Sequence, residues 1–276
     1  MMKRIFVSFA DTRYIKSLER IKSETELFGF DERYFLTEKD LPKDFFKGFS
    51  PKIYRRGFGY WTWKPYIVNK MLEKLDEGDI LVYSDAGTQW HISGKNRFEE
   101  YINMLSLDTP LLTFQQPFLT KDWTKGDVFQ YICPDTWLKY AMELQLWGGT
   151  FFLRKNKLSV NLLKRWLDIA DNHKSLMTDV KSKTPNPCGF REHRHDQSVF
   201  SLLVKQIPHV EISWQEVEPL DEIWNGRDAY PIWAKRDKSF SLIGKIKRRL
   251  RLLPSYPIGL YLKYIKGFYF QSKIAW

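Results

Sequence analysis

The first 36 residues of the chain form a pattern of strand, helix and strand. Residues 5–10 are a short, mostly apolar run, which is typical of a buried strand. Apolar side chains then recur every three to four positions across residues 14–27, which predicts an amphipathic helix, and Gly29 predicts its end. Residues 31–36 predict a second strand. Two strands joined by a helix are the opening of an α/β fold.

The same alternation continues for most of the chain. The expected elements are a helix at 65–75, a strand at 79–87 that ends in small and acidic residues, a helix at 97–105, a strand at 110–114, a helix at 135–145, a strand at 150–154, and helices at 157–171 and 196–205. There is no internal repeat and no low-complexity linker. The sequence therefore predicts one α/β domain over residues 1–237 and a separate tail over residues 238–276.

The tail differs sharply from the body in charge. The whole chain has a formal net charge of +11, but residues 238–276 hold nine Lys or Arg and no acidic residue. The body is therefore almost neutral, with 35 basic and 33 acidic side chains. A nearly neutral body argues against a surface built for nucleic acid, whereas the basic tail points to an anionic partner.

The tail also has an amphipathic pattern. One helical face carries Leu242, Ile243, Ile246, Leu250 and Leu253, with cations opposite, and seven Tyr, Phe and Trp rings lie between residues 256 and 276. This pattern is typical of a helix that lies in the interface of an anionic membrane. The alternative is a helix that packs on the body with a solvated basic face.

Nothing in the sequence indicates a membrane span or export. No apolar run approaches the roughly 20 residues that a spanning helix needs, and the apolar stretch after Met1 is too short for a signal peptide. Cys133 and Cys188 fit no zinc spacing, and a reducing compartment explains them most simply. The expected location is cytoplasmic, on the inner face of the membrane.

The strand at 79–87 delivers a carboxylate to a place where α/β sheets bind ligands. Asp85 follows the apolar run and precedes Ala86 and Gly87. Ligands of open α/β sheets bind beyond the carboxyl ends of strands, and a carboxylate there can hold a divalent cation against phosphate oxygens. The structural alternative is that Asp85 only caps the next element.

Residues 55–66 mix cations, glycines and aromatic rings just before a predicted helix. Arg56 and Lys64 offer hydrogen-bond donors to phosphate, and Tyr60 and Trp63 offer faces on which a flat ring can stack. This composition fits a nucleoside diphosphate. It also fits an aromatic packing loop.

A dense run of ionisable residues precedes the last predicted helix. His193 and His195 share one side of an extended chain and lead into Asp196 and Gln197. Ionisable groups are costly to bury unless they are paired or used, so the run indicates a site, although paired histidines are more often simply hydrogen-bonded. Gly148 and Gly149 permit an extended backbone beneath a ligand, or a turn.

Several common enzyme classes find no support in the sequence. It has no Gly-Lys-Ser phosphate loop, no GxGxxG after the first strand, no HExxH and no GxSxG. Common kinases, Rossmann dehydrogenases, zincins and serine hydrolases are therefore excluded.

Four blocks in register resemble a bacterial glycosyltransferase of the GT-A fold. They are GYWTWKPYIV, GDILVYSDAG, GGTFFLRKN and FREHRHDQSVFSLL, within residues 3–205, and they resemble enzymes encoded with capsule and lipopolysaccharide genes. The resemblance implies a Rossmann-like domain with a mixed sheet that binds a nucleotide sugar.

The resemblance also implies site residues. GT-A enzymes bind a divalent metal, Mn²⁺ or Mg²⁺, through an Asp-x-Asp motif, of which only Asp85 is present here. The second ligand would be His195, or Arg56 and Lys64 would neutralise the diphosphate instead. The residues expected to bind the donor are Ser8, Phe9, Arg56, Tyr60, Trp63, Lys64, Ser84, Asp85, Ala86, Gly87 and Gly149.

The pair Asp196-Gln197 is similar to the Asp-Gln pair of retaining galactosyl- and glucosyltransferases such as the glycogenin-like group. Asp196 and Gln197 are therefore the expected catalytic residues, beside the anomeric carbon, and retention is favoured. An inverting enzyme would instead use Asp196 or Glu192 as a general base.

The sequence thus predicts a hexosyltransferase that moves a sugar from a nucleoside diphosphate, expected to be UDP, to a glycan or lipid-linked acceptor of a bacterial surface polysaccharide. One alternative is a membrane-docked protein that binds a sugar nucleotide or nucleic acid without catalysis. Another is a metal-dependent hydrolase using Asp85, His193, His195 and Asp196.

Overall fold

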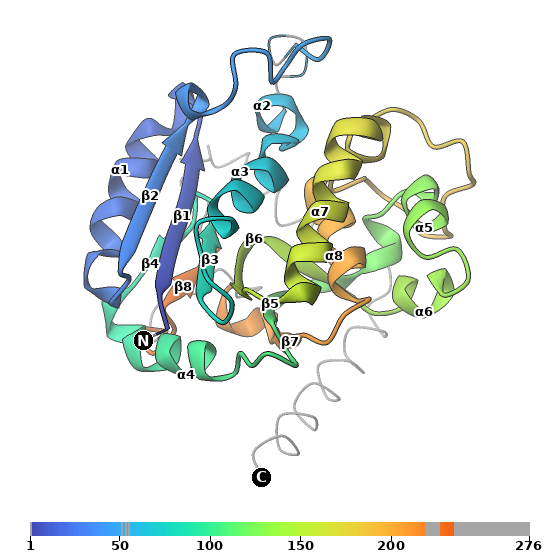
Figure 1. Cartoon of the computed structure of the whole chain (residues 1–276). Coiled ribbons are helices and arrows are strands. Elements are labelled where there is room, and N and C mark those ends of the chain that lie inside the picture. Colours follow the sequence, from blue (N-terminus) through green and yellow to red (C-terminus); the bar gives the residue numbers. More distant parts are fainter. Residues whose placement is uncertain (1, 51, 53, 55, 219–226, 235–276) are drawn as a thin grey trace, which may run out of the picture. The chain divides into compact units, whose positions relative to one another are not determined.

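The computed structural model describes residues 2–218 and 227–234, apart from residues 51, 53 and 55. Six strands form the main sheet, and their spatial order is β2 (Glu32–Thr37), β1 (Arg4–Ala10), β3 (Ile80–Ser84), β6 (Leu144–Arg154), β5 (Leu111–Leu119) and β7 (Val210–Ile212) (Figure 1). Strand β1 is parallel to β2 and β3, and β6 is antiparallel to β3 and β5. Strand β7 is parallel to β5. The expected α/β class with a mixed sheet is confirmed.

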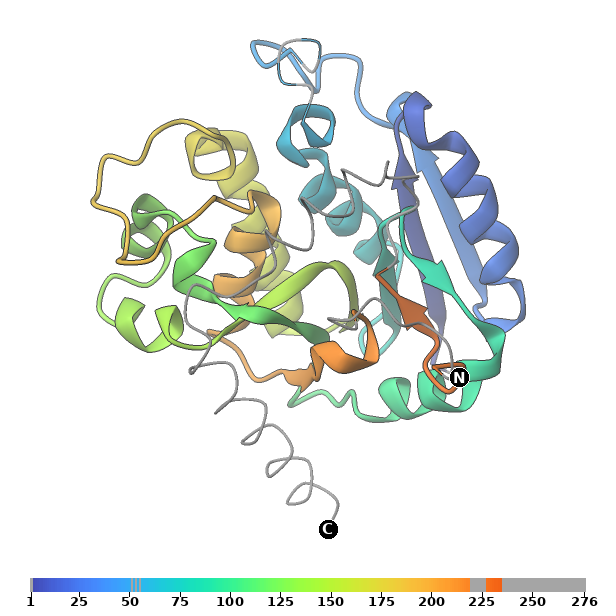
Figure 2. The same cartoon turned by 180° about the vertical axis from the view of Figure 1, so that it is seen from behind.

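Helices cover both faces of this sheet. One face packs against α1 (Ile15–Glu24) and α4 (Lys95–Asn103). The other packs against α3 (Trp63–Leu72), α5 (Gly126–Ile132), α7 (Lys157–Asn172) and α8 (Asp196–Val204). Figure 2 shows the sheet from behind, where a second small sheet pairs β4 (Gln89–Trp90) with β8 (Ile232–Trp233).

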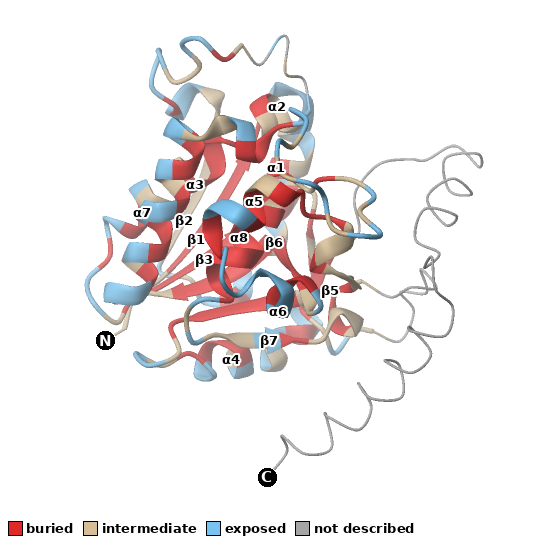
Figure 3. Cartoon of the chain, turned by 90° about the vertical axis from the view of Figure 1, so that its right-hand side faces the viewer, coloured by how far each residue is buried: buried red, intermediate tan, exposed pale blue. Residues whose placement is uncertain are grey.

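Alternating side chains of the central strands explain this layering. In β1, Ile5, Val7 and Phe9 belong to the core beneath α3 and α7, whereas Phe6 and Ala10 belong to the core beneath α1 and α4. Successive side chains of a strand point to opposite faces, so an apolar strand in the middle of a sheet supplies both cores. Figure 3 shows the result, with buried strands inside and exposed residues on the outer turns of the helices.

Most predicted elements are present, but several boundaries were wrong, and the strand expected at 110–114 continues to Leu119 as β5. The helix expected at 135–145 is only α6 (Trp137–Ala141), and the strand expected at 150–154 begins at Leu144 as β6. Leu144, near the end of the expected helix, belongs to the sheet instead. Helix α5 and strands β4, β7 and β8 were missed because they are short.

Two further expectations concern membrane-spanning helices and the tail. Within the described residues, no helix is long and apolar enough to cross a membrane. The tail at 238–276 lies outside the described residues, so its expected helix stays a prediction.

Candidate active site

The candidate site begins where β1 and β3 end side by side. Because β1 and β3 are parallel, their carboxyl ends lie at the same edge of the sheet. Asp85 directly follows Ser84, which pairs with Thr150 of the antiparallel β6. The Asp85 backbone N–H donates to the Gly149 carbonyl at 2.7 Å. The edge therefore places Asp85 beside the two glycines of β6.

A buried lysine joins the two predicted carboxylates. Lys64, in the first turn of α3, has its Nζ 3.1 Å from Asp85 Oδ1 and 2.6 Å from Asp196 Oδ2. The same ammonium donates to the Gly148 carbonyl at 3.0 Å. An ammonium has three donors, and these three contacts use all of them. Lys64, Asp85 and Asp196 are called the acid–lysine triad below.

The triad is a strongly coupled buried ion cluster. The side chain of Lys64 is only 2% exposed and that of Asp196 only 7%. Burial raises the pKa of Asp196 to about 6, and the nearby charge of Asp85 adds to the rise while Lys64 opposes it. Burial would lower the pKa of Lys64, but the two carboxylates outweigh it and raise that pKa. Lys64 therefore stays charged, and burial favours the neutral form of Asp196.

Tyr83 supports the triad from within β3. Its hydroxyl donates to Asp85 Oδ1 at 2.7 Å, and its ring lies 5.3 Å from the Lys64 ammonium. Burial raises the pKa of Tyr83 well above its ordinary value, with the charge of Asp85 acting in the same direction. Tyr83 is thus a neutral donor that orients Asp85, whose side chain is still 35% exposed.

Helix α8 brings the Asp196-Gln197 pair to the same place. The side-chain amide of Gln197 donates to Gln145 Oε1 at 2.7 Å. Gly148 lies against the helix start, and a Cβ there would be 3.2 Å from Gln197 Cα. A glycine at position 148 therefore permits the close approach of β6 to the pair.

A strained turn leads into Lys64. Five consecutive residues, Gly57–Trp61, have positive φ values, and three of them carry side chains: Phe58 (50°), Tyr60 (55°) and Trp61 (57°). A left-handed turn costs about 1–2 kcal/mol per non-glycine residue. Thr62 Oγ1 donates to the Gly59 carbonyl and Trp63 Nε1 to the Gly57 carbonyl, at 3.0 and 3.1 Å. Strain of this kind persists where the surroundings enforce it, often at functional sites.

The strained turn contacts the segment before α8. Tyr60 Oη donates to Asp179 Oδ2 at 2.9 Å, and the rings of Tyr60 and Trp61 lie 4.9 and 5.7 Å from the His195 ring. Arg56 pairs with Glu192 and lies 3.7 Å from Asp179 Oδ1. Two segments that are far apart in the sequence therefore meet beside the triad.

Lys125 fixes the start of this second segment. Its ammonium donates to the carbonyls of Ser175, Thr178 and Val180, the last two at 3.0 and 3.1 Å. Burial lowers the pKa of Lys125. The lysine thus holds the backbone on both sides of Asp179.

Both histidines of the predicted run are buried and bonded to backbone carbonyls. His193 Nε2 lies 2.7 Å from the Leu176 carbonyl, and His195 Nδ1 lies 3.0 Å from the Met177 carbonyl. Burial lowers the pKa of His193 well below its usual range, and burial together with Arg56 lowers that of His195 to about 4. Both rings are neutral at physiological pH.

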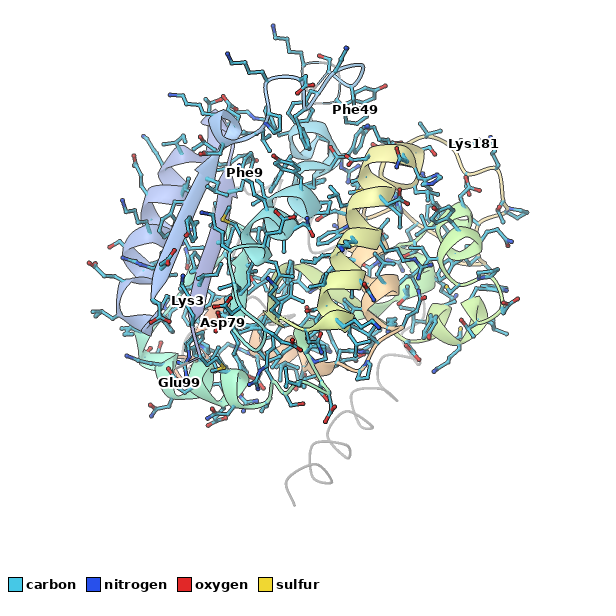
Figure 4. The ribbon with its side chains drawn as sticks, in the orientation of Figure 1. Lys3, Phe9, Phe49, Asp79, Glu99 and Lys181 are labelled. Carbon is cyan, nitrogen blue, oxygen red and sulfur yellow. The ribbon has the colours of Figure 1, made fainter. Side chains whose placement is uncertain are left out.

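The expected donor residues fall into three groups. Lys64, Asp85 and Gly149 meet at the triad, and Arg56 and Tyr60 meet at Asp179. The remaining expected residues are more enclosed. Ser8 and Ala86 are buried, and Gly87 is half-buried in the turn after Asp85. The Phe9 ring stacks on the Trp63 ring with 4.0 Å between ring centroids. Ser84 Oγ is hydrogen-bonded to Thr150 and Trp90. Figure 4 labels Phe9 near the end of β1.

The expected metal ligands do not form a metal site in this arrangement. Asp85 Oδ1 already contacts an ammonium and a hydroxyl, while His195 Nε2 faces Asp179 Oδ1 at 3.6 Å. No group of three or more His, Cys, Asp or Glu side chains able to hold a metal is present in the described part of the chain. The donor set does not fit a divalent cation, which prefers several oxygen ligands and is repelled by an ammonium.

Sequence reasoning missed four residues of the site. Tyr83 and Gln145 lie inside strands, where the sequence pattern indicates core positions. The pattern indicates a surface position for Lys125. Asp179 lies in a segment without periodicity. The only available signal was that a Tyr at the end of an apolar strand tends to need a partner for its hydroxyl.

Comparison with known proteins gives similarity of fold only. No family model and no curated protein matches the chain. Among solved structures, the galactosyltransferase LgtC in complex with donor and acceptor sugar analogues is similar at 14% identity, covering 93% of this chain and 99% of that chain, with a TM-score of 0.48.

Two further solved structures are similar. Mouse xyloside xylosyltransferase 1 in its apo form has 13% identity, 85% and 97% coverage and a TM-score of 0.44. A glycosyltransferase involved in glycosylation of the major capsid of PBCV-1 has 13% identity, 78% and 84% coverage and a TM-score of 0.43. All three scores lie below 0.5, so these likenesses do not establish a shared activity.

Proposed function

We propose that the chain is a glycosyltransferase that uses a nucleoside diphosphate sugar. The observation that carries this proposal is the acid–lysine triad at the carboxyl ends of β1 and β3, with Gln197 beside it. Such an edge is where α/β sheets bind nucleotides. A buried lysine paired with the buried carboxylate of Asp196 and the half-exposed carboxylate of Asp85 is more than packing requires, because buried ion pairs seldom add stability over apolar residues.

Gln197 is the candidate group at the anomeric carbon. Because its nitrogen bonds Gln145, the amide is oriented and its Oε1 oxygen is the group available to a developing positive charge. Asp196, the neighbouring residue, adds negative charge and is held by Lys64. As the bond from the sugar carbon to the diphosphate oxygen breaks, its electron pair leaves with the diphosphate. The acceptor hydroxyl oxygen forms the new bond to the sugar carbon, and its proton passes to the departing diphosphate oxygen.

Arg56 is the candidate phosphate ligand. Its side chain is 40% exposed, whereas all three donors of Lys64 are used by the protein. We therefore assign Lys64 to positioning the two carboxylates, and Arg56 to the departing diphosphate by exchange from Glu192 and Asp179.

The finer assignments rest on the sequence. The resemblance of the four blocks supports a hexose donor linked to UDP, a glycan or lipid-linked acceptor, a role in bacterial capsule or lipopolysaccharide synthesis, and retention. The basic, aromatic sequence at 238–276 supports binding to an anionic membrane surface on the cytoplasmic side. A divalent cofactor stays a prediction of the same resemblance, and no step above depends on it.

The test combines nucleotide binding and turnover. We expect UDP or GDP to raise the thermal midpoint, because a ligand at a hundredfold excess over its dissociation constant stabilises the folded state by about 2.7 kcal/mol. The screen is run with Mn²⁺, with Mg²⁺ and with EDTA, which tests the cofactor separately.

Turnover is then measured as release of nucleotide from sugar nucleotides. Gln197→Ala should lower the rate by about 10²-fold or more. It should lower the free energy of unfolding by only about 1–3 kcal/mol, because the one bond that it removes leaves the buried Gln145 Oε1 without its donor. Failure of every nucleotide to shift the midpoint, or wild-type turnover in Gln197→Ala, would contradict the proposal.

A further inference from the structure

The Nε2 atom of His195 is a buried hydrogen-bond acceptor without a donor among the described residues. Its Nδ1 lies 3.0 Å from the Met177 carbonyl, and a carbonyl only accepts, so Nδ1 carries the hydrogen. Nε2 of the neutral ring therefore bears a lone pair. Within the described residues, this buried atom has no hydrogen-bond partner. Buried polar atoms are almost always bonded, so an orphan acceptor needs a reason.

The atom that faces this lone pair is another acceptor. Asp179 Oδ1 lies 3.6 Å from His195 Nε2, which is beyond hydrogen-bond distance. An imidazole lone pair and a carboxylate oxygen do not attract each other directly. The gap between them suits a group that carries its own hydrogen, such as a hydroxyl that bonds one of them.

The surroundings can be reached and are suited to a sugar. The Asp179 side chain is 47% exposed, whereas that of His195 is 2% exposed. Tyr60 and Trp61, both half-buried, place their rings against His195, and Tyr60 Oη holds Asp179 Oδ2. Aromatic rings beside a carboxylate and an imidazole acceptor match the mixed apolar faces and hydroxyl donors of a carbohydrate.

The group of His195, Asp179, Tyr60 and Trp61, called the cluster below, lies next to the triad in the sequence. His195 directly precedes Asp196 in the chain, and its backbone φ of 51° is one of four positive values outside glycine among the described residues. Lys125 holds the backbone at Thr178 and Val180, on either side of Asp179. Figure 4 labels Lys181, two residues after Asp179 in the same segment.

We infer that His195, Asp179, Tyr60 and Trp61 form a subsite for the hydroxyl groups of the acceptor sugar. The inference that the sugar is an acceptor rests on the proposed glycosyl transfer; binding of carbohydrate hydroxyls does not. A sugar hydroxyl donates to His195 Nε2 or to Asp179 Oδ1, while Tyr60 keeps the carboxylate oriented.

The experiment measures sugar binding without turnover. Methyl β-D-glucoside and methyl β-D-galactoside are titrated into the full chain in the presence and absence of UDP, and binding is followed by saturation-transfer NMR. Cyclohexanol serves as an apolar ring with one hydroxyl. We expect at least one glycoside to bind and cyclohexanol not to bind.

Two mild variants locate the binding. Asp179→Asn removes the charge from an exposed side chain, and Tyr60→Phe removes only the hydroxyl that orients it. Each should weaken glycoside binding roughly tenfold, the loss expected for one hydrogen bond to a charged group. Asp135→Asn, an exposed acid elsewhere on the body, should leave binding unchanged.

A spectroscopic readout covers His195 without mutation. In the chain already saturated with UDP, so that any move of Arg56 away from Asp179 has already occurred, the ¹⁵N resonance of His195 Nε2 should move on addition of glycoside. The subsite is overturned if UDP binds but neither glycoside does, if both variants bind sugar as wild type does, or if the Nε2 resonance stays still. Sugar binding by a chain that binds no nucleotide would instead refute the proposed function and leave the subsite standing.

Discussion

Replacing Lys64 by methionine tests the triad most directly. The substitution keeps the length and apolar stem of the side chain but removes the ammonium that contacts Asp85, Asp196 and the Gly148 carbonyl. Removal of one partner from a buried ion pair costs about 3–5 kcal/mol, because the remaining charge is left uncompensated. The cost should fall mainly on Asp196, which is 7% exposed, rather than on Asp85, which is 35% exposed.

The pH dependence of the loss follows from the pKa of Asp196. Burial already raises this pKa to about 6, and Lys64 opposes the rise, so its removal should raise the pKa further. A carboxyl with a folded pKa above its unfolded value binds more protons when folded. The associated stability is therefore present at low pH and lost as pH rises. In Lys64→Met the loss continues above pH 6, by up to about 1.4 kcal/mol per pH unit.

Thermal and urea denaturation at pH 5 and pH 8 measure the effect. At about 2–4 °C per kcal/mol, the midpoint of Lys64→Met should fall by roughly 10 °C at pH 8 and by less at pH 5. The double variant Lys64→Met/Asp196→Asn should recover at least about 2 kcal/mol, because no buried charge is then left alone. Lys70→Met, an exposed lysine of the same helix, is the control and should change stability by less than about 0.5 kcal/mol.

Two results would refute this reasoning. One is a midpoint of Lys64→Met equal to that of wild type at pH 8. The other is a double variant no more stable than the single variant, which would show that Asp196 is not the charge that Lys64 compensates.

The remaining predictions concern β6, the cysteines and the tail. A Cβ on Gly149 would lie 2.4 Å from Trp147 Nε1, so Gly149→Ala should cost about 1–3 kcal/mol in urea denaturation; an unchanged midpoint would show that the ring moves freely. Burial raises the pKa of Cys133 to about 11, whereas Cys188 is exposed. A thiol reagent at pH 8 should therefore label Cys188 alone, which mass spectrometry of the peptides measures. Equal labelling of the two cysteines would contradict the burial of Cys133. Deletion of 238–276 should release the protein from anionic liposomes in a sedimentation assay, and unchanged binding would reject membrane contact through the tail.

Local patterns were enough to predict the layers of the fold. The strand at 5–10 and the helix after it follow from apolar spacing, and the structure has them at Arg4–Ala10 and Ile15–Glu24. Where an element is short, the pattern fails. The helix at 135–145 was predicted about twice as long as α6, because Leu144 pairs with Leu119 in the sheet instead. Hydrophobic spacing is a property of a single element. The residue at which a strand begins also depends on the neighbouring strand with which it pairs.

The amino-acid sequence specifies which chemical groups follow the strands and begin the helices. They are Asp85 after an apolar strand, Asp196 and Gln197 in the first turn of a helix, and cations among aromatic rings before another helix. How these groups combine depends on the packing of distant segments. Trp63 and Lys64 are neighbours in the sequence, yet the ring stacks on Phe9 while the ammonium reaches two carboxylates from distant segments. The reason is physical: a buried ammonium needs acceptors on every donor, and the packing of α3 against the sheet edge, which no local spacing reveals, supplies them.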